Sequence, residues 1–267
     1  MPYADTNGIK MYYEESGEGD PVIMIMGVTA NGAVWEAHAE DWSQHFRCIM
    51  PDNRGVGLSD KPEGEYSAAM MADDYAGLMD ELGIEKARIV GVSMGSIIAQ
   101  ELALRHPDKV QSTVLMCSWV KVDRYATAIF NHMITCKSRL RPEQFMEWVQ
   151  TLIFTKPFWD NDDCHQGLLD GLNDAATNPS PQPVHGLEGQ VAACINHDTS
   201  DRLSKISCPT LVIGGINDMF TPKWMGEEVA AAIPNCDQHL YENAGHAFHW
   251  ECMDDFNPRV REWLAAH

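Results

Sequence analysis

Basic residues are scarce in this chain, which has 19 lysines and arginines against 39 aspartates and glutamates and a formal net charge of −20. Proteins that bind nucleic acids or anionic membrane surfaces need clustered lysine and arginine, because these residues displace counterions. Long apolar runs are also missing, and none approaches the roughly 18 residues that a membrane span requires. We therefore expect a soluble protein whose partners are small molecules, with no nucleic acid and no membrane among them.

No pair of cysteines has the CxxC spacing, although the chain contains eight of them. A chain of 267 residues buries enough surface to fold without disulfides, so reduced thiols are the simplest interpretation. The first residues, Met1 to Asp5, show neither a basic leader nor an apolar export signal. A cytoplasmic location is the default expectation that follows.

Apolar periodicity alternates between short strands and helices over two parts of the chain. Asn7-Gly8 first predicts the turn of an antiparallel hairpin. Strands are then predicted over 22–26, 48–50, 87–92, 110–116, 210–213 and 238–241, and helices over 33–46, 68–82, 96–105, 222–233 and at the C-terminus as far as 264. Strands that alternate with helices indicate the α/β class, with a mostly parallel sheet covered on both faces.

The alternation is lost between positions 119 and 199. Helical spacing over 126–135 and 142–154 leads into a proline-rich loop at 178–183. We predict that residues 119–199 form a helical cap inserted into an α/β core of residues 1–118 and 200–267. Methionines and aromatic residues are frequent in this cap, which favours a largely apolar pocket. For any single one of them, plain packing of the cap onto the sheet is the stronger interpretation.

The segment Gly91-Val92-Ser93-Met94-Gly95 has the pattern G-x-S-x-G and lies between a predicted strand and a predicted helix. A turn sharp enough to lift the serine oxygen clear of the backbone leaves no room for side chains two residues before and after it. Average composition would produce the pattern in roughly one chain in ten of this length, so its placement is the stronger signal. We predict that Ser93 is a nucleophile; an idle serine in an ordinary turn is the alternative.

A serine hydroxyl is a weak nucleophile that needs a base, and the base needs a third group to orient it. On an α/β sheet the acid and the histidine follow the serine in that order, each in a loop after a later strand. Asp218 follows the predicted strand 210–213, and His246 follows the last predicted strand. The sequence therefore predicts that Ser93, Asp218 and His246 form a catalytic triad.

Each of these assignments has a rival. Asp218 could act only as the N-terminal support of the helix that follows it. His249 is the nearest competitor of His246, although it is predicted to lie within the final helix. His246, His249 and Cys252 could also be metal ligands, but they lack a fourth partner. We therefore expect neither a metal nor a cofactor.

Attack on a carbonyl group places negative charge on its oxygen, which must be stabilised by hydrogen-bond donors. The expected donors are two backbone amides, that of Val28 after the first buried strand and that of Met94 after the serine. Gly27 keeps the approach to the first amide open, although a glycine here is also an ordinary strand terminator.

With these motifs the chain resembles the α/β-hydrolase superfamily, most closely its compact capped branch of esterases, enol-lactonases and related hydrolases. The resemblance covers nearly the whole chain and rests on five motifs in order: Met26-Gly27-Val28, Pro51 to Asp60, Gly91 to Gly95, Pro209 to Asp218, and Gly245-His246. It implies a sheet of about eight strands with the active site between sheet and cap, and the same triad and amide donors.

The resemblance also marks two positions outside the triad. Asp52 and Arg54 correspond to a structural turn of the family rather than to catalytic residues. Many relatives have histidine where this chain has Met26. Because the donor expected from this loop is a backbone amide, we expect the departure to change the polarity of the pocket floor and to leave activity intact.

The activity implied is hydrolysis of a small to medium, fairly apolar carboxylic ester or lactone through an acyl-enzyme. A serine at position 93 excludes the related enzymes of this fold whose nucleophile is a carboxylate, namely haloalkane dehalogenases and epoxide hydrolases. Carbon-carbon bond hydrolases and cofactor-free haloperoxidases or perhydrolases use the same triad and stay open, as does a ligand-binding relative without activity. The oligomeric state is open too, with a homodimer as one option.

Overall fold

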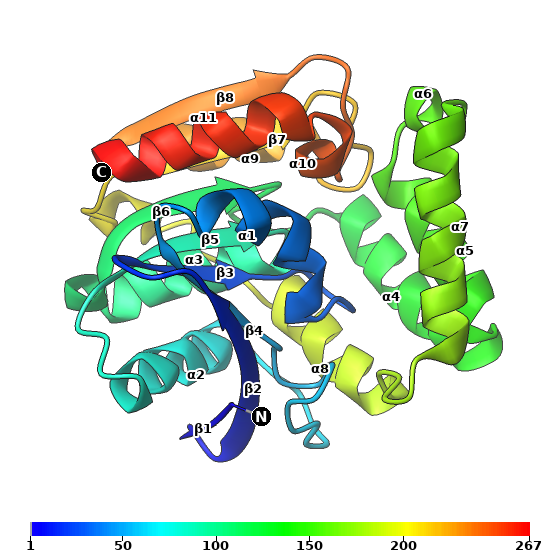
Figure 1. The fold of residues 1–267 in the computed structure, drawn as a ribbon, viewed down its shortest axis with the longest axis horizontal. Coiled ribbons are helices and arrows are strands. Elements are labelled where there is room, and N and C mark those ends of the chain that lie inside the picture. Colours follow the sequence, from blue (N-terminus) through cyan, green and yellow to red (C-terminus); the bar gives the residue numbers. More distant parts are fainter. Residues whose placement is uncertain (1) are drawn as a thin grey trace.

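A single sheet of eight strands lies at the centre of the computed structural model, which describes residues 2–267 (Figure 1). The order of its strands is β1-β2-β4-β3-β5-β6-β7-β8. The strands are β1 Tyr3–Thr6, β2 Ile9–Ser16, β3 Pro21–Ile25, β4 Arg47–Pro51, β5 Ala87–Val92, β6 Val110–Met116, β7 Thr210–Gly215 and β8 Cys236–Tyr241. The expected number of strands is thereby confirmed.

Helices connect most of these strands. The α-helices are α1 Glu36–Trp42, α2 Ala68–Glu81, α3 Met94–Arg105, α4 Arg124–Arg139, α5 Pro142–Ile153, α6 Lys156–Trp159, α7 Asp162–Thr177, α8 Val184–Ile195, α9 Lys223–Ala232, α10 Phe248–Glu251 and α11 Met253–Ala266. Three short 3₁₀ helices are η1 Gly32–Trp35, η2 Pro107–Lys109 and η3 Leu203–Lys205. None of the helices in residues 2–267 combines the length and the apolar composition needed to cross a bilayer.

The strands from β3 to β8 run parallel, and only the pairs β1–β2 and β2–β4 are antiparallel. The hairpin of β1 and β2 turns at Asn7 and Gly8, which both adopt positive φ, as the sequence predicted. The predicted α/β class with a mostly parallel sheet is therefore confirmed.

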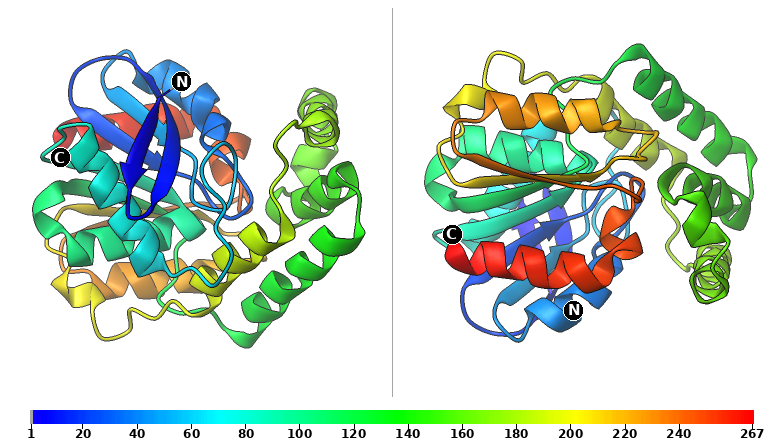
Figure 2. Two further views of the ribbon diagram at one scale, coloured as in Figure 1. Left: turned by 90° about the horizontal axis from the view of Figure 1, so that it is seen from below. Right: turned by 90° about the horizontal axis from the view of Figure 1, so that it is seen from above.

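Both faces of the sheet are covered, which explains why the parallel strands are apolar throughout. In β3, Val22 and Met24 join one buried cluster with α1 and α11, whereas Ile23 and Ile25 join the other with α2 and α3. Figure 2 shows α1 and α11 on one side of the sheet and α2, α3 and α9 on the other.

Between β6 and β7 the chain forms α4 to α8. Figure 1 shows α4 to α7 beside the edge of the sheet toward which the arrows of β6 and β8 point. Asp123 accepts a hydrogen bond from the amide of Ala126 at the start of α4, and Pro142 begins α5. The boundaries 119–199 for an inserted cap stay a prediction, and we use "the cap" for these residues below.

Two sequence-based expectations about helices need correction. The predicted helix 33–46 is two pieces, because the chain first makes the 3₁₀ turn η1 and only then α1. His249 does not lie in the final helix but in the short helix α10. Cys252 has φ −124° and ψ 31°, which is not helical, and so it separates α10 from α11.

Buried polar side chains hold the turn after β4. Asp52 accepts hydrogen bonds from the amides of Gly32 and Leu58, both at 2.7 Å. Arg54 forms a buried ion pair with Asp74, with an Nε to Oδ2 distance of 2.6 Å. These contacts fit the structural role that the resemblance implied for Asp52 and Arg54.

Candidate active site

Ser93 occupies the sharp turn between β5 and α3. Its φ of 55° and ψ of −119° are rare for a residue with a side chain. The backbone is held on both sides, because the Ser93 amide donates to the Met116 carbonyl at 2.8 Å and the Ser96 hydroxyl donates to the Ser93 carbonyl at 2.6 Å. The turn therefore keeps the serine in one strained orientation.

The two glycines of the motif are required by contact rather than by flexibility. A Cβ atom on Gly91 would lie 2.2 Å from the carbonyl oxygen of Gly95. A Cβ atom on Gly95 would lie 2.1 Å from the carbonyl oxygen of Ile25. Both distances are far below van der Waals contact, so only glycine permits this approach of helix α3 to the ends of β3 and β5.

Two backbone amides lie next to Ser93. The amide of Met94 belongs to the first residue of α3, and a Cβ atom on Gly27 would lie 3.2 Å from Cβ of Ser93, which places the Gly27-Val28 loop against the serine. Among residues 2–267, neither the Val28 amide nor the Met94 amide donates a hydrogen bond to another group. Both predicted oxyanion donors are thus free to donate.

Asp218 is buried in the loop after β7 and accepts four hydrogen bonds. Its Oδ1 accepts from the amides of Phe220 at 2.8 Å and Thr221 at 2.9 Å. Its Oδ2 accepts from the Thr221 hydroxyl at 2.8 Å and from Nδ1 of His246 at 2.7 Å. Burial raises the pKa of Asp218, but the His246 ring and the Thr221 donors outweigh burial, so the pKa is lowered overall. Asp218 therefore carries a negative charge.

The contact with Asp218 determines which nitrogen of His246 holds the proton. A carboxylate accepts only, so Nδ1 of His246 carries a hydrogen, and in the neutral ring Nε2 is the nitrogen with the lone pair. The His246 loop is tied to the Asp218 loop, because the Asn217 amide donates to the Ala244 carbonyl at 2.9 Å. The ring is thus held in the tautomer that can accept a proton at Nε2.

Ser93 and His246 line one cavity of about 1480 Å³ between the sheet and the cap. Gly27 and Val28 line it as well. Helices α4 and α5 contribute a mostly apolar wall that includes Met133, Phe145, Met146, Val149, Ile153 and, just beyond α5, Phe154. The ammonium group of Lys137, which also lines the cavity, lies 4.7 Å from the centre of the Phe145 ring.

The structure brings together all five predicted site residues, but the part of the chain that it describes lacks one of the expected hydrogen bonds. Asp218 and His246 are hydrogen-bonded, whereas Oγ of Ser93 forms no hydrogen bond with His246 within residues 2–267. Such contacts are often long without substrate and shorten in the reactive complex. The geometry places a hydroxyl, an imidazole oriented by a carboxylate and two amides unpaired within the described residues around one cavity, and acyl transfer requires groups of these kinds.

Comparison with known proteins places this arrangement in a family. Residues 20–134 match the model of the alpha/beta hydrolase fold family. The BpoC protein of Mycobacterium tuberculosis, whose name assigns it provisionally to the non-heme bromoperoxidases, is 32% identical over 97% of this chain and 98% of its own. The chain belongs to the α/β-hydrolase family.

Other relatives show how varied the chemistry of this family is. A 2-hydroxy-6-oxo-6-phenylhexa-2,4-dienoate hydrolase of Comamonas testosteroni is 29% identical to this α/β hydrolase over 97% of this chain and 93% of its own. The crystal structure of an enol-lactonase from Burkholderia xenovorans superimposes with a TM-score of 0.89 at 25% identity, covering 99% of this chain and 100% of that one.

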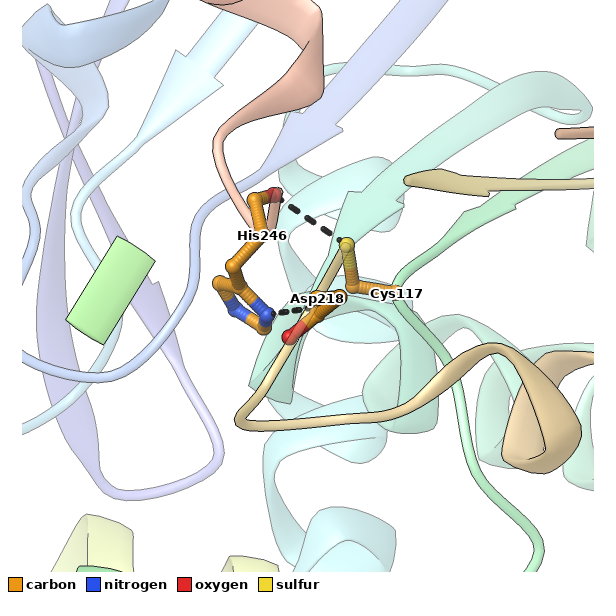
Figure 3. A group of neighbouring side chains, drawn as sticks. All are labelled: Cys117, Asp218 and His246. Carbon is orange, nitrogen blue, oxygen red and sulfur yellow. Dashed lines mark hydrogen bonds and ion pairs between the residues drawn. The ribbon is translucent and has the colours of Figure 1, made fainter. Parts of the chain in front are cut away.

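Sequence reasoning missed Cys117, which lies beside Asp218 and His246 in this α/β hydrolase (Figure 3). It follows β6 with a φ of 50°, and its Sγ donates to the carbonyl oxygen of His246 at 3.2 Å. Burial, followed by the charge of Asp218, raises the pKa of the Cys117 thiol well above its usual value. The thiol therefore stays protonated and supports the His246 loop. Its place at the end of a predicted strand was the only signal.

One donor atom each from Cys117, Asp218 and His246 lie within 4.8 Å of one another, a spacing that could suit a metal ion. The contacts favour a triad, because Nδ1 of His246 already donates to Asp218 and the protonated thiol donates to a carbonyl. Within residues 2–267 no comparable cluster forms from His246, His249 and Cys252, so that alternative from the sequence is wrong. Asp218 does not cap the helix that follows it, because α9 begins at Lys223 without a side-chain cap and the amides bound by Asp218 belong to Phe220 and Thr221, which precede that helix.

Glu251 joins the His246 loop to the cap of this α/β hydrolase. Its Oε2 accepts from the Gly245 amide at 2.8 Å, and its Oε1 accepts from the Thr155 amide at 2.5 Å. The Ala247 amide adds a hydrogen bond to the Ile153 carbonyl at 2.9 Å. The position of the His246 loop is therefore coupled directly to the end of α5.

Proposed function

We propose that this α/β hydrolase is a serine hydrolase that cleaves a small to medium carboxylic ester or lactone through an acyl-enzyme intermediate. Ser93 is the nucleophile, His246 the general base and Asp218 the group that orients it. The amides of Val28 and Met94 are the oxyanion donors. The observation that carries the proposal is the 2.7 Å contact of Asp218 with His246 Nδ1, at a cavity that also holds the strained Ser93.

Each step of the reaction has a group to perform it. Oγ of Ser93 forms a bond to the carbonyl carbon while His246 Nε2 takes the hydroxyl proton. The tetrahedral oxyanion accepts hydrogen bonds from the two amides. When it collapses, the carbon-oxygen bond of the leaving alcohol breaks, and the alcohol takes the proton from His246. Water then gives a proton to His246 Nε2 and attacks the acyl carbon; the bond from that carbon to Ser93 Oγ breaks, Oγ takes the proton back from His246, and the acid is released. In a lactone the alcohol and the acid remain one molecule.

The apolar wall of the cavity supports a fairly apolar substrate. Methionine, phenylalanine and aliphatic side chains of α4 and α5 supply most of it, and binding sites of this composition recognise ligands mainly by buried apolar area. The enol-lactonase likeness supports the ester and lactone class, because that protein's name describes the opening of a lactone.

Labelling with a fluorophosphonate tests the role of Ser93. We expect mass spectrometry to find a single adduct on Ser93, loss of p-nitrophenyl butyrate hydrolysis in step with labelling, and no adduct in Ser93→Ala. Ser93→Ala should lower kcat by roughly 10⁶-fold and Asp218→Asn by roughly 10⁴-fold. Active protein that resists the reagent, or an adduct on another serine, would contradict the proposal.

A second candidate, hydrolysis of a carbon-carbon bond, is favoured by the relative from Comamonas testosteroni. It would use the same triad, so substrates must separate the two. A panel of p-nitrophenyl esters, lactones and vinylogous diketones decides the matter by kcat/KM, and perhydrolysis is measured with the same esters plus hydrogen peroxide. We expect esters or lactones to rank first. Negligible turnover of every class, together with tight ligand binding, would identify a binding protein instead.

A further inference from the structure

A pair of histidines lies beside the cavity and has no part in the proposed triad. His38 comes from α1, His249 from α10, and Asn257 from α11 completes the group. Nδ1 of His38 lies 2.6 Å from Oδ1 of Asn257, and Nε2 of His38 lies 2.9 Å from Nδ1 of His249. All three side chains are buried, with exposed fractions of 0%, 6% and 8%. They form a chain of hydrogen bonds that runs through the protein interior.

Aromatic rings surround this chain and fix its members. The His38 ring centre lies 5.5 Å from that of Trp35 and 5.3 Å from that of Phe256, each in an edge contact. The indole nitrogen of Trp42 donates to the backbone carbonyl of Asn257 at 3.1 Å, which fastens α11 to α1. The imidazole rings therefore have no freedom to rotate away from each other.

Asn257 is the last member of this series of hydrogen bonds, and its side chain determines which nitrogen of each histidine carries the hydrogen. Oδ1 of Asn257 only accepts, so Nδ1 of His38 carries a hydrogen and donates it. Nε2 of His38 then has a lone pair, and it accepts the hydrogen of His249 Nδ1. Burial lowers the pKa of His38 to about 4 and the pKa of His249 well below its usual value, so both rings are neutral. Nε2 of His249 is consequently a fixed hydrogen-bond acceptor.

This acceptor belongs to the same cavity as the proposed triad. His249 lines the cavity together with Ser93, His246 and Val28, and its Nε2 forms no hydrogen bond with any group of residues 2–267. The neighbouring lining residues Ala247 and Phe154 have apolar side chains, and the one polar atom of the Trp250 side chain, its indole nitrogen, is buried. Because no group in the described part of the chain pairs with this acceptor, a donor that enters with the ligand can bind it in place of water.

We propose that His249 recognises a hydroxyl group of the substrate through Nε2, so that this enzyme prefers a hydroxylated ester or lactone to the corresponding deoxy compound. The inference rests on the proposed function and narrows its substrate class. His249 is a specificity residue, and His38 and Asn257 are positioning residues that keep its acceptor turned outward. Sites that hydrogen-bond a substrate hydroxyl discriminate well against analogues without it, because the buried partner is left unpaired.

Matched substrate pairs test this assignment. On the acyl side, p-nitrophenyl 2- and 3-hydroxybutyrate are compared with p-nitrophenyl butyrate, and α-hydroxy-γ-butyrolactone with γ-butyrolactone. On the alcohol side, 2-hydroxyethyl butyrate is compared with propyl butyrate. We expect wild-type kcat/KM to favour at least one hydroxylated member by roughly 3- to 10-fold, the range of a neutral hydrogen bond. His249→Phe should remove that preference, and His249→Gln, which keeps an acceptor oxygen, should restore part of it.

His132→Gln is the matched control, because this exposed cap histidine does not line the cavity. It should leave the preference at its wild-type value. An equal preference in His249→Phe and wild type, or a wild-type enzyme that favours no hydroxylated member, would overturn the assignment. His249→Phe could instead lower kcat/KM equally for both members of every pair, with an unchanged burst followed by slow deacylation. That result would show that His249 positions a water molecule, and it would also overturn the assignment.

Two measurements separate this inference from the proposed function and from misfolding. Fluorophosphonate labelling of Ser93 in His249→Phe reports whether the triad is intact even when the hydroxyl preference is absent. If His249→Phe does not fold, nitrogen-15 spectra of histidine-labelled wild type replace it. We expect Nε2 of His249 to be unprotonated and to shift on addition of 3-hydroxybutyrate but much less on addition of butyrate. A protonated Nε2, or equal shifts with both acids, would overturn the inference.

Discussion

The backbone of Ser93 stores strain at the residue that we propose to be the nucleophile. A side chain at φ 55° and ψ −119° is in a region that glycine occupies far more readily, and such residues cost about 1–3 kcal/mol. The hydrogen bonds to Met116 and Ser96 hold this conformation in place. The strain has a direct consequence for stability, because it disappears in a variant without a side chain.

We therefore predict that Ser93→Gly is more stable than Ser93→Ala by about 1 kcal/mol, although both lack activity. Glycine removes the strain, whereas alanine retains the clash of Cβ with the backbone. The greater freedom of glycine in the unfolded chain offsets part of this gain. Urea denaturation at pH 7.5 measures the difference. If alanine proves the more stable replacement, the turn is not strained in solution.

Among the elements, helix α3 approaches the end of β3 closely near the site. Gly95 is the residue at this contact, and a Cβ atom there would overlap the Ile25 carbonyl oxygen at 2.1 Å. Gly167, in the exposed face of α7, offers the opposite case, because a Cβ atom there would meet nothing within 4 Å. The same substitution should therefore have opposite effects at the two positions.

We predict that Gly95→Ala destabilises the protein by about 3 kcal/mol or more, since α3 must shift away from the sheet. Gly167→Ala should stabilise it by about 0.5–1 kcal/mol, because alanine is the better helix former. Thermal and urea unfolding of the two variants beside wild type measure both effects. Similar stability of the two variants would show that helix α3 has room to move.

A second contact between elements concerns Glu251, which accepts from the amides of Gly245 and Thr155. Removing the carboxylate leaves two partly buried donors without a partner and frees the His246 loop from the end of α5. We predict that Glu251→Ala costs about 1–3 kcal/mol of stability and lowers kcat/KM roughly 10-fold.

Glu251→Gln provides the control for this contact, because its one amide oxygen can satisfy one of the two donors. It should fall between wild type and Glu251→Ala in both stability and kcat/KM. Steady-state kinetics with p-nitrophenyl butyrate and thermal unfolding measure the series. Wild-type kinetics in Glu251→Ala would show that the loop is held well enough by the Ala247 contact to Ile153 alone.

At the scale of the whole molecule, three buried histidines make stability depend on acidity. Burial lowers the pKa of His38 and of His197 to about 4, and it lowers that of His249 well below 6.5. Unfolding exposes these rings and returns their pKa to about 6.5. Below that pH the unfolded chain binds protons that the folded chain does not, so the folded state loses stability as the pH falls from about 6.5 toward 4.

We predict that the free energy of unfolding is nearly level between pH 7 and 7.5 and decreases below pH 6.5. Each of the three histidines contributes about 1.4 kcal/mol per pH unit at most. Urea denaturation between pH 7.5 and 5 measures the slope. His197→Gln removes one titrating ring that lies outside the cavity, so its slope should be shallower. An unchanged slope in that variant would show that His197 is not neutral in the folded protein.

Sequence pattern predicted most of the core, because the signals there are local. Strands β5 and β6 have the predicted ends, since a continuous apolar run bounded by turn residues needs no tertiary information. Helices α7 and α8 were not predicted. The segment of α7 has few apolar residues and two glycines, and α8 contains two glycines next to the proline-rich loop, so their helical form depends on packing against the rest of the chain.

In the candidate site too, some residues were predictable from the sequence and others were not. Ser93, Asp218 and His246 were named from sequence alone, because each stands in a short motif at the end of a strand and the order of the three is characteristic. Which residues surround them was decided only by folding. Cys117 and His38 contact the His246 loop and His249 across more than one hundred positions of the chain.

No local pattern encodes such pairs, because they arise when the parallel strands bring separate loops to one edge of the sheet. The sequence by itself thus determined the chemistry available at the site, namely a hydroxyl, an imidazole and a carboxylate. The tertiary structure decided which ring nitrogen holds each proton. That choice depends on the partner opposite the ring, and the partner comes from another part of the chain.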